Sequence, residues 1–356
     1  MVHRAERFSF LQSPGGKSSR RSPLRFGRIL LFTLLGIGLI GFFLLWFVMI
    51  RMPSTSFRGP LPPLSPEEET SRARVQSHIQ ALAGEIGERN LLSPARLDAA
   101  ADYIESAFRQ IGYEAVPQKY LHNGQWFRNL AVTVPGESRA EEIILLGAHY
   151  DTVMNSPGAD DNATGVATVL ELARLLKAER FGRTIRFLAF TNEEGPSFLT
   201  GQMGSRVYAR EARRRGEKIV AMISIESIGY YSSEKGSQRY PFPLNLFYPG
   251  RGDFIAFVGN IRHRELVRQS IAAFRRRTPF PSEGVAAPSS IPGVAWSDHD
   301  SFWREGYAAM MVTDTVPFRN PHYHRPTDRP ETVDSIRVAR VVHGLADVVR
   351  SLAQGD

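Results

Sequence analysis

The chain has 356 residues, of which 42% are hydrophobic, so it is long enough to bury a full core. Its formal net charge of +8 could suggest nucleic-acid binding, but most of this charge lies at the N-terminus. Residues 1–28 hold seven Lys/Arg and one acid, which leaves 37 bases and 35 acids in the remainder. A nearly neutral remainder argues against a nucleic-acid partner. The chain contains no cysteine, which excludes disulfide bonds and thiolate metal sites.

An uncharged apolar run covers residues 29–50 and is followed directly by Arg51. Its 22 residues are enough for a helix to cross a hydrocarbon core about 30 Å thick. A cleaved signal peptide is the alternative, but the run exceeds the apolar core of such peptides and no small-x-small cleavage site follows it. We therefore predict a single transmembrane anchor at 29–50 after a basic cytoplasmic tail at 1–28. Everything after Arg51 is then extracytoplasmic.

Five prolines between residues 53 and 66 predict a stiff, extended linker at 51–65. Ser65 and Pro66, followed by three glutamates, combine a helix cap, a proline at the first helical position and acids in the first turn. A helix should therefore begin there. We assign residues 66–356 to one soluble domain.

Within this domain, apolar β-branched runs alternate with amphipathic segments. The predicted strands are 130–134, 143–148, 184–191, 219–226, 254–258 and 308–313. The predicted helices are 67–83, 94–111, 163–178, 203–215, 262–275 and 335–353. Most of these strands are apolar throughout, as expected of strands buried on both faces, so the fold class is α/β with a mostly parallel sheet. Residues 230–253 show no periodicity and predict a long loop with a functional role.

Acids and histidines stand at the ends of the predicted strands. His149 ends one strand, Glu193 and Glu194 follow the next, and Glu226 ends a third. Each has an ordinary structural explanation when taken alone, and the Asp160-Asp161-Asn162 segment could form only a turn and a helix cap. A parallel sheet, however, brings these ends to one edge, where the acids would repel one another unless a cation held them. Imidazole and carboxylate ligands without thiolate indicate zinc first and other divalent metals second.

Chemical roles follow from the spacing of these residues. Asp161 has two oxygens and can bridge two metals. Glu193 and Glu194 cannot point the same way on an extended backbone, so one can bind metal while the other acts as a general base. Asp151, two residues after His149, can accept the second ring N–H of that histidine.

Together these residues resemble the co-catalytic di-zinc aminopeptidases, metallopeptidase family M28, whose relatives include bacterial leucyl aminopeptidases, glutamate carboxypeptidase and glutaminyl cyclases. The matching motifs, within about residues 70–356, are His149-x-Asp151, Gly158-Ala159-Asp160-Asp161-Asn162, Asn192-Glu193-Glu194-Gly195, Glu226 and His324. The resemblance implies a three-layer α/β/α fold around a twisted mixed sheet, as in zinc exopeptidases. It also implies two Zn²⁺ ions per chain.

By the same resemblance, His149 and Glu226 hold one zinc ion, and Glu194 and His324 hold the other. Asp161 bridges the two ions. Glu193 is the general base, and Asp151 orients His149.

Two motifs depart from the family pattern. Glu226 stands where the family often has aspartate, and it remains a competent ligand. The last ligand usually lies in His-Thr-x-x-Asp-Thr, whereas residues 324–329 read His-Arg-Pro-Thr-Asp-Arg. His324 matches that ligand, and His322 is its competitor.

A second group of residues is a candidate substrate shell near the metals. Asp298 and His299 lie in a segment that forms either a capped helix or part of this shell. Tyr230, Tyr323 and His322 are further candidates.

The resemblance implies a membrane-anchored zinc exopeptidase that acts on a peptide or small amide, most consistent with an aminopeptidase. A bridging water activated by two metals would attack the scissile carbonyl, with Glu193 as the base. A glutaminyl cyclase or another amidohydrolase on the same scaffold is the alternative. A metal-free binding domain is a third reading, although such a domain would be expected to lack some of the ligands. The oligomeric state is left open.

Overall fold

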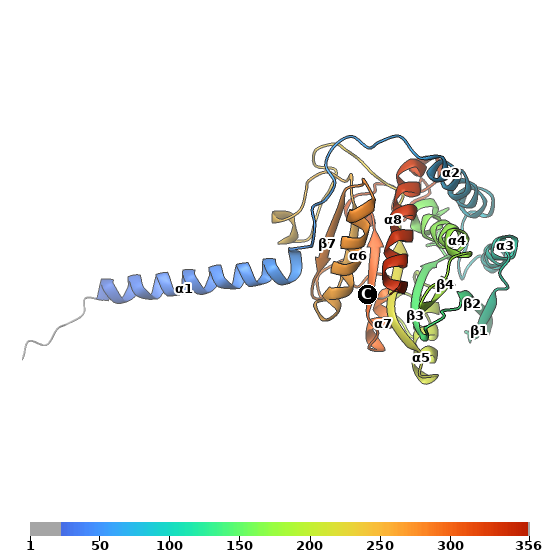
Figure 1. Cartoon of the computed structure of the whole chain (residues 1–356), viewed down its shortest axis with the longest axis horizontal. Helices are drawn as coiled ribbons and strands as arrows, with labels where there is room; N and C mark the ends of the chain where they lie inside the picture. The colour runs from blue at the N-terminus through green and yellow to red at the C-terminus, as the bar shows by residue number, and fades with distance from the viewer. Residues whose placement is uncertain (1–22, 355–356) are drawn as a thin grey trace, which may run out of the picture. The chain divides into compact units, whose positions relative to one another are not determined.

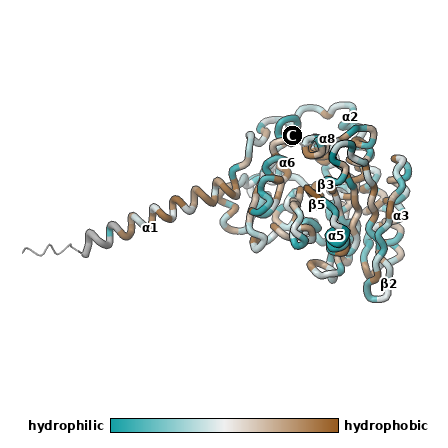
Figure 2. Tube along the Cα trace, turned by 60° about the horizontal axis from the view of Figure 1, so that its bottom comes forward, coloured by the Kyte–Doolittle hydropathy of each residue, from teal (hydrophilic) through white to brown (hydrophobic). Residues whose placement is uncertain are grey.

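The computed structural model describes residues 23–354, in two compact units that meet in sequence between Trp46 and Phe47. In the first unit, α1 (Pro23–Leu45) is mostly apolar (Figure 2). A π-helical turn at Trp46–Ile50 follows α1 and continues into the second unit. Leu30–Ile50 is the one described helix long and apolar enough to cross a membrane, and a signal sequence would meet the same criteria. The basic tail predicted at 1–28 lies outside the described residues as far as residue 22.

An eight-stranded mixed sheet forms the centre of the second unit (Figure 1). Its strands are β1 (Val116–His122), β2 (Gln125–Val134), β3 (Arg139–His149), β4 (Arg183–Phe190), β5 (Lys218–Glu226), β6 (Ile255–Gly259), β7 (Ser282–Ala286) and β8 (Ala309–Thr313). Their spatial order is β1-β2-β4-β3-β5-β8-β6-β7. The central strands β4, β3, β5 and β8 are parallel, as are β6 and β7, whereas β1/β2, β2/β4 and β6/β8 pair antiparallel.

Helices cover both faces of this sheet, which confirms the predicted three-layer α/β/α fold. On one face lie α2 (Pro66–Ile79), α3 (Pro94–Ile111), α4 (Gly165–Leu176), α6 (Arg264–Arg277) and α8 (Ser335–Gln354). On the other face lie α5 (Gly204–Arg214) and α7 (His299–Arg304). The start of α2 is as predicted: the Ser65 hydroxyl accepts the Glu68 N–H, and the Glu68 carboxylate accepts the Ser65 N–H.

The sequence patterns miss β1 and β7, the two edge strands. β1 is largely exposed and mixes proline, glutamine and lysine with apolar residues, while β7 is a five-residue strand that contains Glu283 and Gly284. Neither carries the apolar run of a buried strand. β3 shows the contrast, because only its part from Ile143 onward is fully buried, and that part is the run the sequence predicts.

The predicted linker at 51–65 belongs to the second unit and is hydrogen-bonded within it. The Arg268 guanidinium donates a hydrogen bond to the Arg51 carbonyl at 2.7 Å, and Arg275 donates to the Pro53 carbonyl at 3.1 Å. Both arginines belong to α6. The first residues after the apolar helix are therefore held along α6.

Candidate metal centre

Polar side chains from three parallel strands meet at one edge of the sheet. His149 is the last residue of β3 and Glu226 is the last residue of β5, while Glu193 and Glu194 follow β4 after a short turn. His149, Glu193 and Glu194 are buried, although their environment is rich in charge. The predicted convergence of these strand ends is therefore present in the structure.

The first group of candidate ligands comprises His149, Asp161 and Glu226, whose ligand atoms all lie within 4.8 Å of one another. The His149 Nε2 atom lies 3.4 Å from the Asp161 Oδ1 atom and 3.3 Å from the Glu226 Oε2 atom. At this spacing a single cation could contact all three ligand atoms. An imidazole nitrogen and two carboxylate oxygens are donors that suit zinc.

The second group comprises Asp161, Glu194 and His324, again within 4.8 Å. The His324 Nε2 atom lies 3.1 Å from the Asp161 Oδ2 atom and 3.4 Å from the Glu194 Oε1 atom. Asp161 belongs to both groups: its Oδ1 atom faces His149, and its Oδ2 atom faces His324. This is the arrangement a carboxylate would need in order to bridge two cations.

Of the two competing histidines, the structure brings His324 to this cluster. His322 instead has its Nδ1 atom 3.0 Å from the Thr327 hydroxyl, and its ring packs edge-on against Tyr230. Tyr323 stacks on the His324 ring with 3.7 Å between ring centroids. The Tyr323 ring therefore restricts the orientation of the His324 imidazole.

Asp151 links the histidine to the glutamate pair. Its two carboxylate oxygens accept the backbone N–H groups of Glu193 and Glu194, each at 3.0 Å. The His149 Nδ1 atom lies 3.6 Å from the Asp151 carboxylate and 3.2 Å from the Asp151 carbonyl oxygen. The Glu193 carboxylate is 3.9 Å from the His149 Nε2 atom, so it borders the first group.

Hydrogen bonds between side chains and backbone groups hold the loop that carries Asp161. The Asn162 side chain donates to the Ile225 carbonyl at 2.8 Å and accepts the Ser227 N–H at 3.0 Å, which ties this loop to the end of β5. The Asp328 carboxylate accepts the N–H groups of Asp160 at 2.9 Å and Asp161 at 3.1 Å. Asp328 appears in the sequence motif after His324, but its spacing alone assigns it no role.

Arg89 is a second residue whose part in the site has no sequence signal. It is fully buried. Its guanidinium donates to five backbone carbonyls, including those of Tyr150 at 2.6 Å and Gly158 at 2.9 Å. Burial lowers the Arg89 pKa to about 10, and the negative charge of Asp151 opposes that shift. Arg89 therefore joins the segments that precede Asp151 and Asp161.

The charge of the cluster calls for a cation. Burial raises the pKa of Glu193 well above its ordinary value and that of Glu194 to about 7, which the negative charge of Asp161 reinforces for Glu194. Burial also disfavours ionised Asp161, but hydrogen bonds from His149 and His324 outweigh it and leave its pKa low. Within residues 23–354, the buried Glu194 Oε1 atom accepts no hydrogen bond, although the His324 Nε2 atom lies 3.4 Å from it. The residues present thus fit divalent cations, with zinc first by donor type.

Asp298 and His299, two of the predicted substrate-shell residues, are both buried. Asp298 is fully buried, and burial raises its pKa to about 7. His299 is turned to the Val294 carbonyl at 2.8 Å and packs against Trp303. Ser297, which begins the same segment, donates to the Glu226 carboxylate at 2.7 Å.

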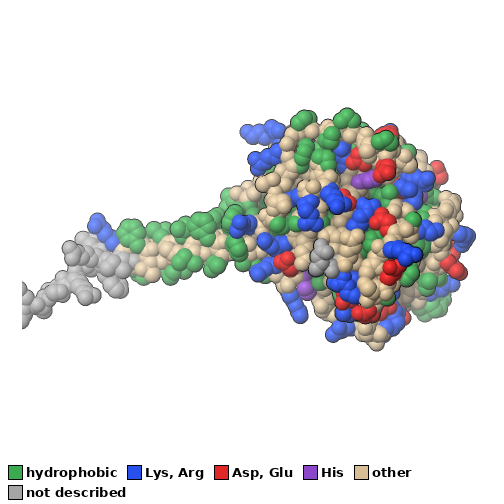
Figure 3. Space-filling view, in the orientation of Figure 1, with side chains coloured by type: hydrophobic (Ala, Val, Ile, Leu, Met, Phe, Trp, Pro, Cys, Tyr) green, Lys and Arg blue, Asp and Glu red, His purple; other side chains and the backbone are tan. Residues whose placement is uncertain are grey.

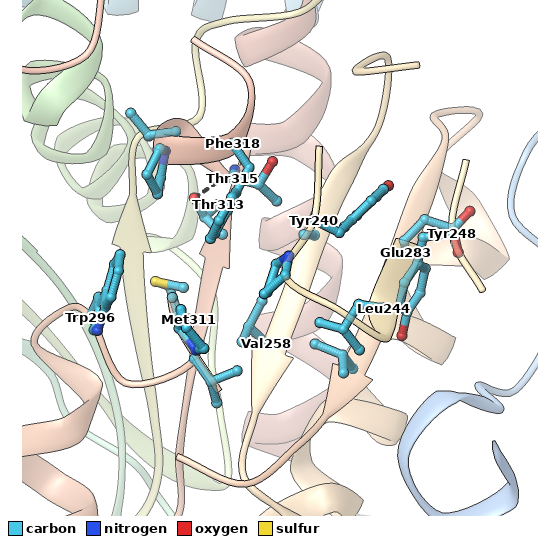
Figure 4. A pocket seen from close by; sticks show the side chains of 18 of the residues that line it. Tyr240, Leu244, Tyr248, Val258, Glu283, Trp296, Met311, Thr313, Thr315 and Phe318 are labelled. Carbon is cyan, nitrogen blue, oxygen red and sulfur yellow. Dashed lines mark hydrogen bonds between the residues drawn. The ribbon is translucent and has the colours of Figure 1, made fainter. Parts of the chain in front are cut away.

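An apolar pocket opens beside the cluster. It is lined by Glu226 and by Tyr323, the residue that stacks on His324. Figure 4 shows this pocket from close by. Strands β6, β7 and β8 contribute part of its lining, and the predicted loop at 230–253 contributes another part. Its apolar lining includes Tyr240, Leu244, Tyr248, Val258, Met311 and Phe318. The Tyr240 and Tyr248 hydroxyls donate to the Pro249 and Gly284 carbonyls, so both are satisfied within the protein. A pocket of this kind suits an apolar group of a ligand.

Comparison with known proteins places these residues in a family context. The sequence pattern of peptidase family M28 matches residues 129–349, a range that contains both candidate ligand groups. The chain is 34% identical to uncharacterized protein YfbL of Escherichia coli strain K12, over 85% of this chain and 95% of that protein. It is 25% identical to a probable leucine aminopeptidase of Trichophyton verrucosum strain HKI 0517, over 74% and 68% of the two chains.

A solved structure with the same fold is that of BSAP, a zinc aminopeptidase from Bacillus subtilis. The two structures superpose with a TM-score of 0.65 over 80% of this chain and 95% of that one, at 15% sequence identity. This likeness confirms the fold.

Proposed function

Because this chain belongs to peptidase family M28 and is a metallopeptidase of the zinc aminopeptidase type, we propose that it is a membrane-anchored exopeptidase that removes amino-terminal residues. The observation that carries the proposal is the sharing of Asp161 by two complete ligand groups. In our proposal His149 and Glu226 would hold one cation, Glu194 and His324 would hold the other, and Asp161 would contribute one oxygen to each. The relatives named aminopeptidases support the choice of chain end.

Two bound divalent cations would supply the positive charge that polarises the scissile carbonyl and acidifies an attacking water. Glu193 would accept the proton of that water and then deliver it to the departing amine. The charge of the cations would also keep the Glu193 carboxylate ionised, against the burial that raises its pKa. Asp151 would position Glu193 through the backbone N–H that it accepts.

The apolar pocket beside Glu226 would take the side chain next to the scissile bond. Its position supports this assignment, because two of its lining residues connect it with the ligand groups: Glu226 belongs to the first group, and Tyr323 stacks on His324 of the second. Most of the lining is aromatic or aliphatic, and its charged members, Glu226 and Glu283, are acids. The pocket therefore favours leucyl or aromatic side chains over acidic ones.

The domain organisation is part of the same proposal. Residues 29–50 would form the anchor, residues 51–65 would connect it to the peptidase domain at 66–356, and the basic tail at 1–28 would stay in the cytoplasm. The single apolar helix at Leu30–Ile50 supports this arrangement. The peptidase domain would then act on extracytoplasmic peptides.

The test combines metal content with substitution of the general base. The full chain, purified in detergent, would be analysed for zinc and assayed against aminoacyl amides, an N-acyl peptide and an amino-terminal glutaminyl peptide. We expect two zinc ions per chain. Glu193→Gln should retain them and lose about 10²–10⁴-fold in kcat, whereas Glu141→Gln, at an exposed glutamate of β3, should behave as wild type.

Three outcomes would contradict the proposal. A chain that binds no metal after reconstitution is not a metallopeptidase. An active Glu193→Gln variant would remove Glu193 from the proposed role. Release of a cyclised product from the glutaminyl peptide, without hydrolysis of the aminoacyl amides, would favour a glutaminyl cyclase.

A further inference from the structure

Arginines gather where the chain leaves its apolar N-terminal helix. Arg51 follows Leu30–Ile50 directly, and Arg58 lies seven residues further on. Helix α6 adds five more arginines, of which Arg275 pairs with Glu283 inside the unit. The remaining six form what we call the basic surface: Arg51, Arg58, Arg264, Arg268, Arg276 and Arg277. Figure 3 shows Lys and Arg side chains on the face of the second unit that bears α6.

This surface carries a strong excess of positive charge. The carboxylates that pair with it are those of Glu265 and Asp347, so the net charge is +4. Both ion pairs are long, at 3.9 Å for Arg268–Glu265 and 3.7 Å for Arg277–Asp347. The charge is therefore largely uncompensated within the described part of the chain.

Contacts with the segment after the apolar helix fix the position of α6. Arg268 donates to the Arg51 carbonyl at 2.7 Å, and Arg275 donates to the Pro53 and Ser54 carbonyls at 3.1 Å. Val48, Met49 and Ile50, the last residues of the apolar run, pack within the second unit. With the rest of the run in a bilayer, Arg51 therefore lies within about 6 Å of the end of the hydrocarbon core. Because Arg268 contacts Arg51 directly, this part of α6 is also close to the headgroups.

One end of α6 also forms a polar hollow. Thr55–Arg58 line it on one side, and Arg275–Pro279 line it on the other. Its lining also includes Glu283, which pairs with Arg275. Arg276 donates only to the Ser351 hydroxyl at 3.4 Å, and the Arg277 side chain is 71% exposed. Guanidinium groups that are free of close carboxylate partners can bind phosphate oxygens through two parallel N–H groups.

We propose that the basic surface binds the anionic headgroups of phospholipids around the anchor and docks the peptidase domain on the bilayer. The inference rests on the membrane anchor of the proposed function, but not on its catalytic chemistry. Negative lipid surfaces attract juxtamembrane arginines, and this attraction decays within a Debye length. The contact between Arg268 and Arg51 brings one part of the basic surface close to the lipid, and the docking that we propose brings Arg276 and Arg277 into that range as well.

The absence of cysteine allows a direct test on the full chain. A single Gln269→Cys substitution, at an exposed position of α6, provides a unique site for a fluorophore. The labelled chain would be reconstituted into nanodiscs of phosphatidylcholine, with or without phosphatidylglycerol, that contain a headgroup-linked quencher. We expect stronger quenching with phosphatidylglycerol and a loss of this difference at high salt.

Charge variants make the test specific. In Arg276→Glu/Arg277→Glu the ratio of docked to undocked chain should fall about fivefold for each arginine removed, and the neutral Gln pair should show a smaller loss. Arg213→Glu/Arg214→Glu changes the same charge on exposed residues of α5, on the other face of the sheet, and should dock like wild type.

Several results would overturn the proposal. Equal quenching in both nanodiscs at low salt would show that anionic lipid is not recognised. Equal losses in the α5 and α6 variants would reduce the effect to net charge. Loss of quenching in inorganic phosphate, but not in chloride of equal ionic strength, would indicate a site for free anions. Failure of the chain to insert into nanodiscs would show that residues 29–50 are not a membrane anchor, and the docking proposal would fall with it. A chain that docks but has no peptidase activity would contradict only the catalytic proposal.

Discussion

The Asp328 carboxylate binds the backbone of the loop that carries Asp161. One of its oxygens accepts the Asp161 N–H at 3.1 Å, and the other accepts the Asp160 N–H at 2.9 Å. Asp328 is itself buried and lies in the loop after His324. One side chain therefore connects the proposed bridging ligand with the loop that provides the last ligand. Its effect on metal binding is open to direct measurement.

Asp328→Asn should weaken zinc binding by about 10–100-fold while the fold is retained. The amide has one acceptor oxygen and cannot accept both N–H groups, so the Asp161 loop should become less ordered. Competition with a chromogenic chelator measures the affinity, and thermal unfolding checks the fold. Asp98→Asn, at an exposed position of α3, is the control. Unchanged zinc affinity in Asp328→Asn would show that the Asp161 loop needs no such support.

His324→Ala and His322→Ala should differ in both zinc content and activity. Because only His324 joins a ligand group, its loss should remove one zinc ion and reduce kcat/KM at least about 10²-fold. His322 contacts Thr327 and Tyr230, so His322→Ala should keep both ions and most of its activity. Zinc per chain, measured by elemental analysis, gives the answer. The reverse result would exchange the roles of the two histidines.

Filling the apolar pocket should change substrate preference. Met311→Trp places a larger side chain in the lining and should lower kcat/KM for leucyl and phenylalanyl amides by about 10–200-fold, with a smaller loss for an alanyl amide. Leu246→Trp lies in the same loop region but outside the lining, and its side chain is exposed, so it serves as the control. A uniform loss over all three amides would mean that the pocket does not hold the substrate side chain.

Stability should fall as pH is lowered from about 6.5 toward 4. Burial lowers the pKa of His299 to about 4, so in this range the unfolded chain binds a proton that the folded chain does not. Because the unfolded state binds more protons, the free energy of unfolding rises with pH across this window and reaches its full value above it. The His299 contribution at pH 7 is of the order of 3 kcal/mol relative to pH 4.

Urea unfolding at several pH values checks this. His299→Asn should flatten the dependence between these limits relative to wild type, while zinc-linked changes remain in both proteins. Parallel curves for the two proteins would show that His299 does not contribute.

Two sequence features sufficed for the architecture and for most of the candidate site. Apolar runs identify the central strands, because a strand covered on both faces cannot carry exposed polar residues. His149 and Glu226 end such runs, and the parallel direction of β3 and β5 brings both to one edge. The strands β1 and β7 escape this reasoning, since edge strands need no continuous apolar run.

The choice between His322 and His324 depends on tertiary structure, as do the roles of Asp328 and Arg89. Asp328 reaches Asp161 across 167 positions of sequence, and Arg89 reaches Gly158 across 69. The pattern of side chains along a strand or helix is a local property, so the sequence by itself determined which elements form and which acids and histidines end them. Contacts between loops depend on how the finished sheet and helices pack, so only the tertiary structure decided which of those side chains share a centre and which residues support them.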